Sequence, residues 1–296
     1  MSKLSFSGHD SFQCRNLWLK KGYEFVIYDK DFNADEAVIE LGVGKNMVTA
    51  IRYWMRSFGL MDDDGGLTKL SSMILDDDGF DPYLEDIGSL WLLHYHLVKE
   101  GKASIYNLFF NRFRKQRVEF TKKQFKDYLV NHTEILGESH SPNTIETDVG
   151  VFLKSYAPER SKGRKYLEDQ YSSLLMDLNL VRVLDAEVTS DKETRETRYA
   201  VRNERRDSLP LEVFLFTILD NPKFGKSISL PKLMNDPNSP GVVFALDGDS
   251  IVDMIKSIVR ERDDLVYKDD AGLRELQILK DIDKFQVIEE YYNDRG

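Results

Sequence analysis

The stretch ADEAVIELGVGKNMVTAIRYWMRSFGLM, residues 34–61, decides the fold that the sequence predicts. Apolar residues recur at intervals of three and four on both sides of Gly42, which predicts two short helices joined by a tight turn. The apolar positions of the second helix define one buried face. That core face is expected to contain Met47, Val48, Ile51, Trp54, Met55 and Phe58. Two short helices in this order are the sequence pattern of a helix-turn-helix.

The opposite face of the second helix is expected to meet solvent, and it is basic although the whole chain has a net charge of −10. Basic and polar side chains at helical spacing suit contacts to phosphates and to base edges in the major groove. We therefore expect DNA to contact Lys45, Asn46, Thr49, Arg52, Tyr53 and Arg56. The alternative is a helix-turn-helix that serves only protein contacts or domain packing.

The residues after this helix predict a wing. Gly59–Met61 and Leu67–Leu70 are expected to form two short strands around a turn at Asp62–Gly66, which extends the motif to residue 75. Three consecutive aspartates, Asp62 to Asp64, lie in that turn. Because they would repel a phosphate backbone, this wing is not expected to lie against DNA.

The whole chain is expected to be mainly α with short β-hairpins. We predict an N-terminal arm plus winged helix-turn-helix at residues 1–80, a helical region with a basic surface at 81–160, and a C-terminal winged-helix-like α+β domain at 161–296. The polar stretch APERSKGRK, residues 157–165, is the candidate linker because it contains Pro158 and Gly163. The later elements are predicted as helices at 166–178, 209–219 and 250–262, strands at 181–188 and 197–201, and a hairpin at 265–279.

Composition limits the class of protein. Hydrophobic residues make up 41% of the chain and charged residues 31%, which is typical of a folded soluble protein. Cys14 is the only cysteine, which excludes an intramolecular disulfide and a Cys-rich zinc site. No apolar run approaches the roughly 20 residues that span a bilayer, and no signal peptide is evident. We expect a cytoplasmic protein.

A second basic segment runs from Lys99 to Lys126 and holds nine basic and two acidic residues. Aromatic residues alternate with the basic ones, which suits either stacking on single-stranded nucleic acid or burial in a core. Both interpretations stay open at this point. The further candidates for DNA contact in this segment are Arg112, Arg114, Lys115 and Arg117.

The tightest polar constellation for catalysis is Gly8-His9-Asp10-Ser11. His9 is a candidate general base or metal ligand, and Asp10 would orient it or join the metal. The alternative is that the two residues cap a helix or fix the N-terminal arm to the core. A second acidic group contains Asp81, Glu85 and Asp86. These carboxylates are expected to cap a helix and to interact with its dipole. No nuclease motif is present, and LGVGKN lacks the spacing of a phosphate-binding Walker loop.

Four motifs resemble a known family: FSGHDSF at 6–12, WLKKG at 18–22, LGVGKNMVTAIRYW at 41–54 and DPYLEDIGSLWLLHYHL at 81–97. Together they resemble the DUF4007 family, including the SspB-type proteins of DNA phosphorothioation and phage-defence clusters. Asp10 departs from the glutamate that is usual in that family. The resemblance implies sulfur-transfer (phosphoadenosine-phosphosulfate-reductase-like) and ATPase proteins as partners.

The resemblance also implies DNA nicking, for which a divalent metal such as Mg²⁺ is the expected cofactor. We therefore expect a DNA-binding component of a bacterial phosphorothioation system that nicks DNA to allow sulfur incorporation. The alternative is a non-enzymatic winged-helix adaptor or transcriptional regulator. Whether the chain is an enzyme stays open in the sequence.

Overall fold

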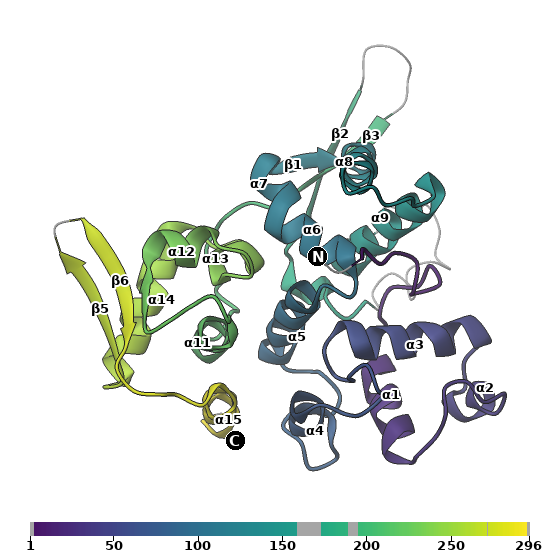
Figure 1. Cartoon of the computed structure of the whole chain (residues 1–296), viewed down its shortest axis with the longest axis horizontal. Coiled ribbons are helices and arrows are strands. Elements are labelled where there is room, and N and C mark those ends of the chain that lie inside the picture. The colour runs from purple at the N-terminus through teal and green to yellow at the C-terminus, as the bar shows by residue number, and fades with distance from the viewer. Residues whose placement is uncertain (1–2, 159–172, 189–194, 271, 295–296) are drawn as a thin grey trace. The chain divides into compact units, whose positions relative to one another are not determined.

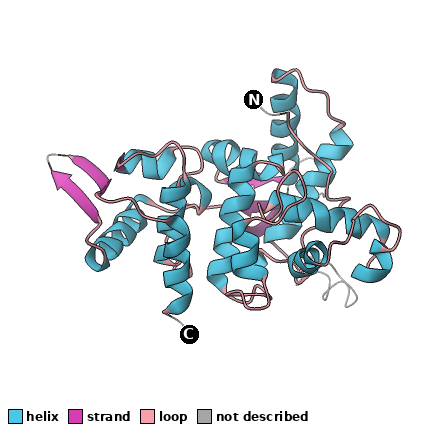
Figure 2. Cartoon of the chain, turned by 60° about the horizontal axis from the view of Figure 1, so that its bottom comes forward, coloured by secondary structure: helices cyan, strands magenta, loops and turns pink. Residues whose placement is uncertain are grey.

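The computed structural model describes residues 3–158, 173–188, 195–270 and 272–294. It is mainly helical with two small antiparallel sheets, as the sequence predicted (Figures 1 and 2). The chain divides into two compact units, Met1–Val201 and Arg202–Gly296. The predicted boundary at residue 160 and most of the predicted helix 166–178 lie outside the described residues. The three-part division of the chain therefore stays a prediction.

The first unit contains helices followed by a small sheet. Its helices are α1 (Trp18–Ile27), α2 (Ala37–Leu41), α3 (Lys45–Ser57), α4 (Lys69–Leu75), α5 (Ile87–Glu100), α6 (Ser104–Leu108), the π-helical turn η1 (Phe109–Phe113), α7 (Arg114–Gln116), α8 (Lys122–Ile135), α9 (Pro142–Tyr156) and the 3-10 turn η3 (Met176–Leu178). The strands β1 (Glu119–Thr121), β2 (Arg182–Val188) and β3 (Arg195–Ala200) pair antiparallel in the order β1-β3-β2.

The helix–turn–helix arrangement of α2 and α3 forms where the sequence predicted it. Gly42 ends α2 with a φ of 64°, a left-handed conformation that glycine adopts without a steric cost. The predicted core face of α3 is buried, with Ile51 and Met55 fully covered and Trp54 only 1% exposed. Met47 is the exception because it is half-buried at the start of the helix.

The two predicted wing strands, at residues 59–61 and 67–70, are wrong. Only a single bridge forms there, between Met61 and Leu67. Thr68 instead caps α4, because its hydroxyl accepts a hydrogen bond from the backbone N–H of Ser71 at 3.3 Å. Leu70 and Leu75 are then buried on one face of this helix. A capping threonine followed by apolar residues at helical spacing outweighed the alternation that suggested a strand.

The aromatic residues of the basic segment form the core of the first unit. Phe109, Phe113 and Phe120 are at most 1% exposed. The Phe109 ring packs on Phe152 of α9, with 4.5 Å between the ring centroids. Core burial is therefore the correct interpretation of this pattern, and stacking of these rings on bases is excluded.

The second unit has the helix-then-hairpin order that the sequence predicted. Its elements are α11 (Leu211–Asp220), β4 (Ser227–Ser229), α12 (Leu230–Asn235), α13 (Pro240–Val243), α14 (Gly248–Glu261), β5 (Leu265–Asp270), β6 (Leu273–Ile278) and α15 (Lys284–Asn293). The strands pair antiparallel in the order β4-β6-β5. Across the described parts of both units, no helix is long and apolar enough to cross a bilayer.

Asp81 and Asp86 accept different hydrogen bonds at the start of α5. Asp86 is the N-cap and accepts from the backbone N–H of Gly88 at 2.7 Å. Asp81 is only 7% exposed. It accepts from the backbone N–H groups of Glu85 at 2.9 Å and Asp86 at 3.0 Å, and from the Ser89 hydroxyl. The structure therefore supports a structural role for these carboxylates.

Asp81→Ala is expected to destabilise the protein more than Asp86→Ala. The first change leaves several buried donors without an acceptor and is expected to cost about 3 kcal/mol. The second removes one helix cap and is expected to cost about 1 kcal/mol. Urea denaturation followed by circular dichroism measures both free energies of unfolding. Equal losses would show that Asp81 acts only as another cap.

Candidate functional site

The N-terminal loop Phe6–Phe12 packs against both α3 and α9. The backbone N–H of Ser7 donates to Asp148 Oδ1 of α9 at 2.9 Å, and Trp54 Nε1 of α3 donates to the Phe12 carbonyl at 3.1 Å. A Cβ atom on Gly8 would lie 2.4 Å from the Tyr53 ring. Only glycine therefore allows the loop to approach α3 this closely.

The backbone of this loop is strained. Ser7, Asp10 and Ser11 have φ values of 68°, 45° and 67°. Non-glycine residues adopt this left-handed region at a cost of about 1–3 kcal/mol each, and such residues cluster at functional sites. A tight turn accompanies the strain, since the N–H of Asp10 donates to the Ser7 carbonyl at 3.2 Å. Three such residues between Ser7 and Ser11 make this loop a candidate functional segment.

His9 lies inside the loop and is 1% exposed. Its Nε2 lies 3.2 Å from Asp148 Oδ1, and its Nδ1 accepts from the backbone N–H of Ser11 at 3.2 Å. A neutral ring then carries its proton on Nε2, facing the carboxylate. The ring stacks on Trp54, with 5.8 Å between centroids. The partner that orients His9 is therefore Asp148 rather than the expected Asp10.

The sequence did contain a signal for Asp148. Ile145, Val149 and Phe152 follow the buried face of α9, and each is 0% exposed. Asp148 lies among them at 1% exposure, and an unpaired carboxylate is rarely buried in this way. The pairing of Asp148 with His9 could not be predicted, because the two residues are far apart in the sequence.

We define the buried polar cluster as His9, Tyr53, Ser57 and Asp148. Within the residues that the structure describes, His9 Nε2, Tyr53 Oη, Ser57 Oγ and Asp148 Oδ2 are buried without a hydrogen bond of regular geometry, although Ser57 lies close enough to Tyr53 to lower the pKa of its hydroxyl slightly. Burial, and to a lesser extent the charge of Asp148, raises the pKa of the Tyr53 hydroxyl. Unsatisfied polar atoms gathered at one place are rare in folded proteins and indicate a site with a purpose beyond packing.

The predicted DNA-contacting residues of α3 divide into two groups. Lys45, Asn46 and Thr49 are exposed on the first turns of the helix. Arg52 also reaches the surface, where its Nη1 donates to Asn33 Oδ1 at 2.9 Å. Together these residues form a continuous polar surface, which we name the α3 face.

Tyr53 and Arg56 lie differently from the prediction. The Tyr53 hydroxyl points into the buried polar cluster, so it is not available to a base edge. Arg56 is half-buried, and its Nη2 donates to the Asp63 carbonyl at 3.1 Å. The N-terminal loop packs on Tyr53, whereas the turn after α3 holds Arg56.

Lys102 partly neutralises the acidic turn that follows α3. The Asp63 carboxylate pairs with Lys102 Nζ at 2.5 Å, and a hydrogen bond and the charge of this lysine lower the pKa of Asp63. The Asp62 carboxylate accepts from the backbone N–H of Gly66 at 2.7 Å and shapes the turn. The aspartates therefore have local structural partners.

The predicted contacts of the second basic segment also need one correction. Arg112, Lys115 and Arg117 are exposed, but Arg114 is only 6% exposed. The π-helical turn Phe109–Phe113 precedes it. An i→i+5 turn rotates the residues that follow it relative to a regular helix, so the members of this basic run do not all face solvent.

The expected metal site is not assembled from the predicted residues. In the described ranges, no group of three or more histidine, cysteine, aspartate or glutamate side chains is arranged to hold a metal ion. His9 has one carboxylate neighbour, and Asp10 lies in the turn beside it.

The chain belongs to DUF4007, a family of proteins of unknown function whose model matches residues 6–292. Two solved structures are similar to it: a magnesium ion-bound SspB crystal structure, with a TM-score of 0.81, and an SspB crystal structure, with a TM-score of 0.79. Each is 29% identical and covers 98% of this chain and 88% of the other chain. No curated protein matches this chain. The resemblance that the four motifs indicated is confirmed.

Asp148→Ala and Tyr53→Phe are expected to have different effects on stability. Removing Asp148 leaves the Ser7 N–H without its acceptor and His9 Nε2 without its charged neighbour, and is expected to cost about 3 kcal/mol. Removing the Tyr53 hydroxyl deletes a buried group that makes no hydrogen bond of regular geometry, so stability is expected to stay within about 0.5 kcal/mol or to rise. Urea denaturation measures both. A large loss in Tyr53→Phe would show that its hydroxyl has a stabilising partner.

Proposed function

We propose that this chain is a DNA-binding component of a bacterial DNA phosphorothioation and phage-defence system. The observation that carries the proposal is the α3 face, where Lys45, Asn46 and Thr49 are exposed and Arg52 is half-buried on one helix. In this interpretation α2 and α3 act as a helix-turn-helix, with α3 in the major groove. Membership of DUF4007 and likeness to SspB support the choice of system.

The start of α3 suits a phosphate. Gly44 is the N-cap and provides no side-chain hydrogen bond to the first turn. Lys45 follows, and a positive side chain at a helix N-terminus is opposed by the helix dipole. A phosphate oxygen at this position would accept from backbone N–H groups and offset both charges. The same end of the helix carries Asn46 and Thr49, whose side chains suit base edges.

Lys45→Ala combined with Arg52→Ala is expected to weaken duplex DNA binding. Loss of two cationic contacts should also lower the slope of log affinity against log salt by about 1.8. Fluorescence anisotropy with a labelled duplex at several salt concentrations measures both quantities. Arg56 is left intact in this variant because it holds the Asp62–Gly66 turn.

Lys232→Ala combined with Lys256→Ala is the matched control. Both lysines are exposed in the second unit, and the net charge changes by the same amount. This variant is expected to bind the duplex like the wild type. The proposed duplex surface is wrong if the α3 variant binds no more weakly than this control.

DNA nicking is the second candidate function, and the strained loop around His9 is the observation that favours it. Strain and a His–carboxylate pair are features of catalytic sites. His9 is buried, so nicking by this residue requires the loop to open first. Mg²⁺ is the proposed cofactor, and Asp10 stays a proposed contributor. The sulfur-transfer and ATPase proteins of the same system are the proposed partners.

His9→Gln is expected to abolish nicking while duplex binding persists. Glutamine keeps a polar side chain of moderate size but has no imidazole to exchange a proton. The experiment incubates supercoiled plasmid with wild type, His9→Gln or Asp10→Asn, in Mg²⁺ and in EDTA, and measures open-circular product. A wild-type protein that binds DNA but gives no such product would favour the alternative of a non-enzymatic adaptor or regulator.

A further inference from the structure

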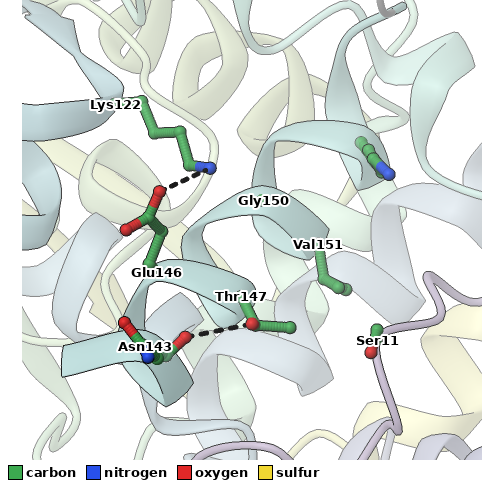
Figure 3. A pocket seen from close by; sticks show the side chains of 8 residues that line it. Ser11, Lys122, Asn143, Glu146, Thr147, Gly150 and Val151 are labelled. Carbon is green, nitrogen blue, oxygen red and sulfur yellow. Dashed lines mark hydrogen bonds and ion pairs between the residues drawn. The ribbon is translucent and has the colours of Figure 1, made fainter. Parts of the chain in front are cut away.

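Two hollows lie side by side on the surface of the first unit. The first has a volume of about 550 Å³ and is lined by Ser11 of the N-terminal loop, Lys122 of α8, and Thr147 and Lys154 of α9, among others. Figure 3 shows Ser11 and Val151 on one side of it and Lys122 and Glu146 on the other. Its walls therefore come from the N-terminal loop and from the consecutive helices α8 and α9, which lie more than 100 residues further along the chain.

The second hollow has a volume of about 390 Å³ and shares Lys122 and Glu146 with the first. Lys123, Lys126 and Tyr199 of β3 also line it. Because Lys122 and Glu146 border both hollows, they form the ridge between them. The two hollows together make a track along α8 and α9, which lie side by side (Figure 1). We name this surface the lysine track.

The lysine track is more basic than the chain as a whole. Lys122, Lys123, Lys126 and Lys154 line it, against Glu146 and Glu196. Each volume lies in the range of pockets that hold a ligand of nucleotide size. The sequence placed the α8 lysines in a long basic segment but gave no sign that α9 and β3 complete a hollow around them.

Glu146 occupies the position that an anionic ligand would take. Its carboxylate lies 2.6 Å from Lys126 Nζ and 3.5 Å from Lys122 Nζ. The two lysines lower the pKa of Glu146, so it is ionised at neutral pH. A phosphate offers the same lysines a stronger acceptor with more oxygens. Glu146 therefore acts as an internal counter-anion that a bound phosphate displaces.

Tyr199 adds a feature that phosphate binding alone does not need. Its ring lines the second hollow and stacks on the buried Phe120 ring, with 5.8 Å between centroids and 30° between planes. An aromatic ring held in place beside lysines suits a base that has left the duplex stack. A duplex presents phosphates on a convex surface and keeps its bases stacked, so it does not fill hollows of this kind.

We propose that the lysine track binds a single strand of nucleic acid, with Lys122 and Lys126 on its phosphates and a base beside Tyr199. The proposal rests on the proposed function and deepens it, because it gives the same protein separate surfaces for duplex and for single strand. Ser11 lines the track two residues after His9. A bound strand therefore passes beside the strained loop.

The first test compares Lys122→Ala combined with Lys126→Ala against the Lys232→Ala/Lys256→Ala control. The probe is a labelled oligothymidine of about 12 nucleotides, measured by anisotropy at several salt concentrations. The track variant is expected to bind at least about tenfold more weakly, with a salt slope lower by about 1.4. Its affinity for duplex is expected to stay within about twofold of wild type. Single-strand affinity no weaker than the control overturns the proposal.

Glu146→Gln is the second test and is independent of any loss of folding. Removing the counter-anion frees both lysines, so affinity for oligothymidine is expected to rise about threefold or more. Unchanged or weaker binding of oligothymidine contradicts the proposed role of Glu146 and the proposal that the lysine track binds a single strand. An abasic deoxyribose-phosphate oligomer of the same length is expected to bind about tenfold more weakly to wild type. Equal affinity for this probe shows phosphate binding without base contact and contradicts the proposal.

These outcomes separate the two proposals. One outcome is that Lys45→Ala/Arg52→Ala leaves duplex binding intact while Lys122→Ala/Lys126→Ala weakens binding of the single strand. This outcome contradicts the proposed role of the α3 face and supports that of the lysine track. The opposite outcome is that the α3 variant binds duplex more weakly while the track variant keeps its affinity for the single strand. This outcome contradicts the proposed role of the lysine track and supports that of the α3 face.

Discussion

The contact between His9 and Asp148 joins the N-terminal loop to α9, and much of the first unit depends on it. The same carboxylate accepts from the Ser7 backbone, so one buried charge fixes two points of the loop. Gly8 can then lie against the Tyr53 ring, and the Trp54 indole can reach the Phe12 carbonyl. The left-handed conformations of this loop persist because these contacts together outweigh their cost.

The loop also borders each surface that we assign to nucleic acid. Its inner side packs on Tyr53 and Trp54 of α3, whose opposite side carries the α3 face. Its outer side contributes Ser11 to the lysine track. A change in the His9 contact would therefore reach both surfaces through packed side chains. This arrangement gives a physical route by which one bound strand affects the other surface.

Nearby carboxylates pair with the lysines of the surfaces that we propose for nucleic acid. Glu146 neutralises Lys122 and Lys126, and Asp63 pairs with Lys102. Such exposed pairs add little stability, since water and salt screen them. In the binding that we propose, nucleic acid exchanges one anion for another, which would favour strands whose phosphates match the spacing of the lysines.

Local patterns in the sequence determined the helical class, the α2–turn–α3 arrangement, the core face of α3 and the C-terminal hairpin, because helix spacing and glycine conformations act over a few residues. Tertiary packing alone decided that Asp148 would face His9, that Tyr53 would point inward, and that Arg114 would be buried after a π-helical turn. It also brought Ser11, Lys122 and Tyr199 to one surface. Contacts between distant segments depend on how whole helices and strands pack. The spacing of residues within one segment does not predict these contacts.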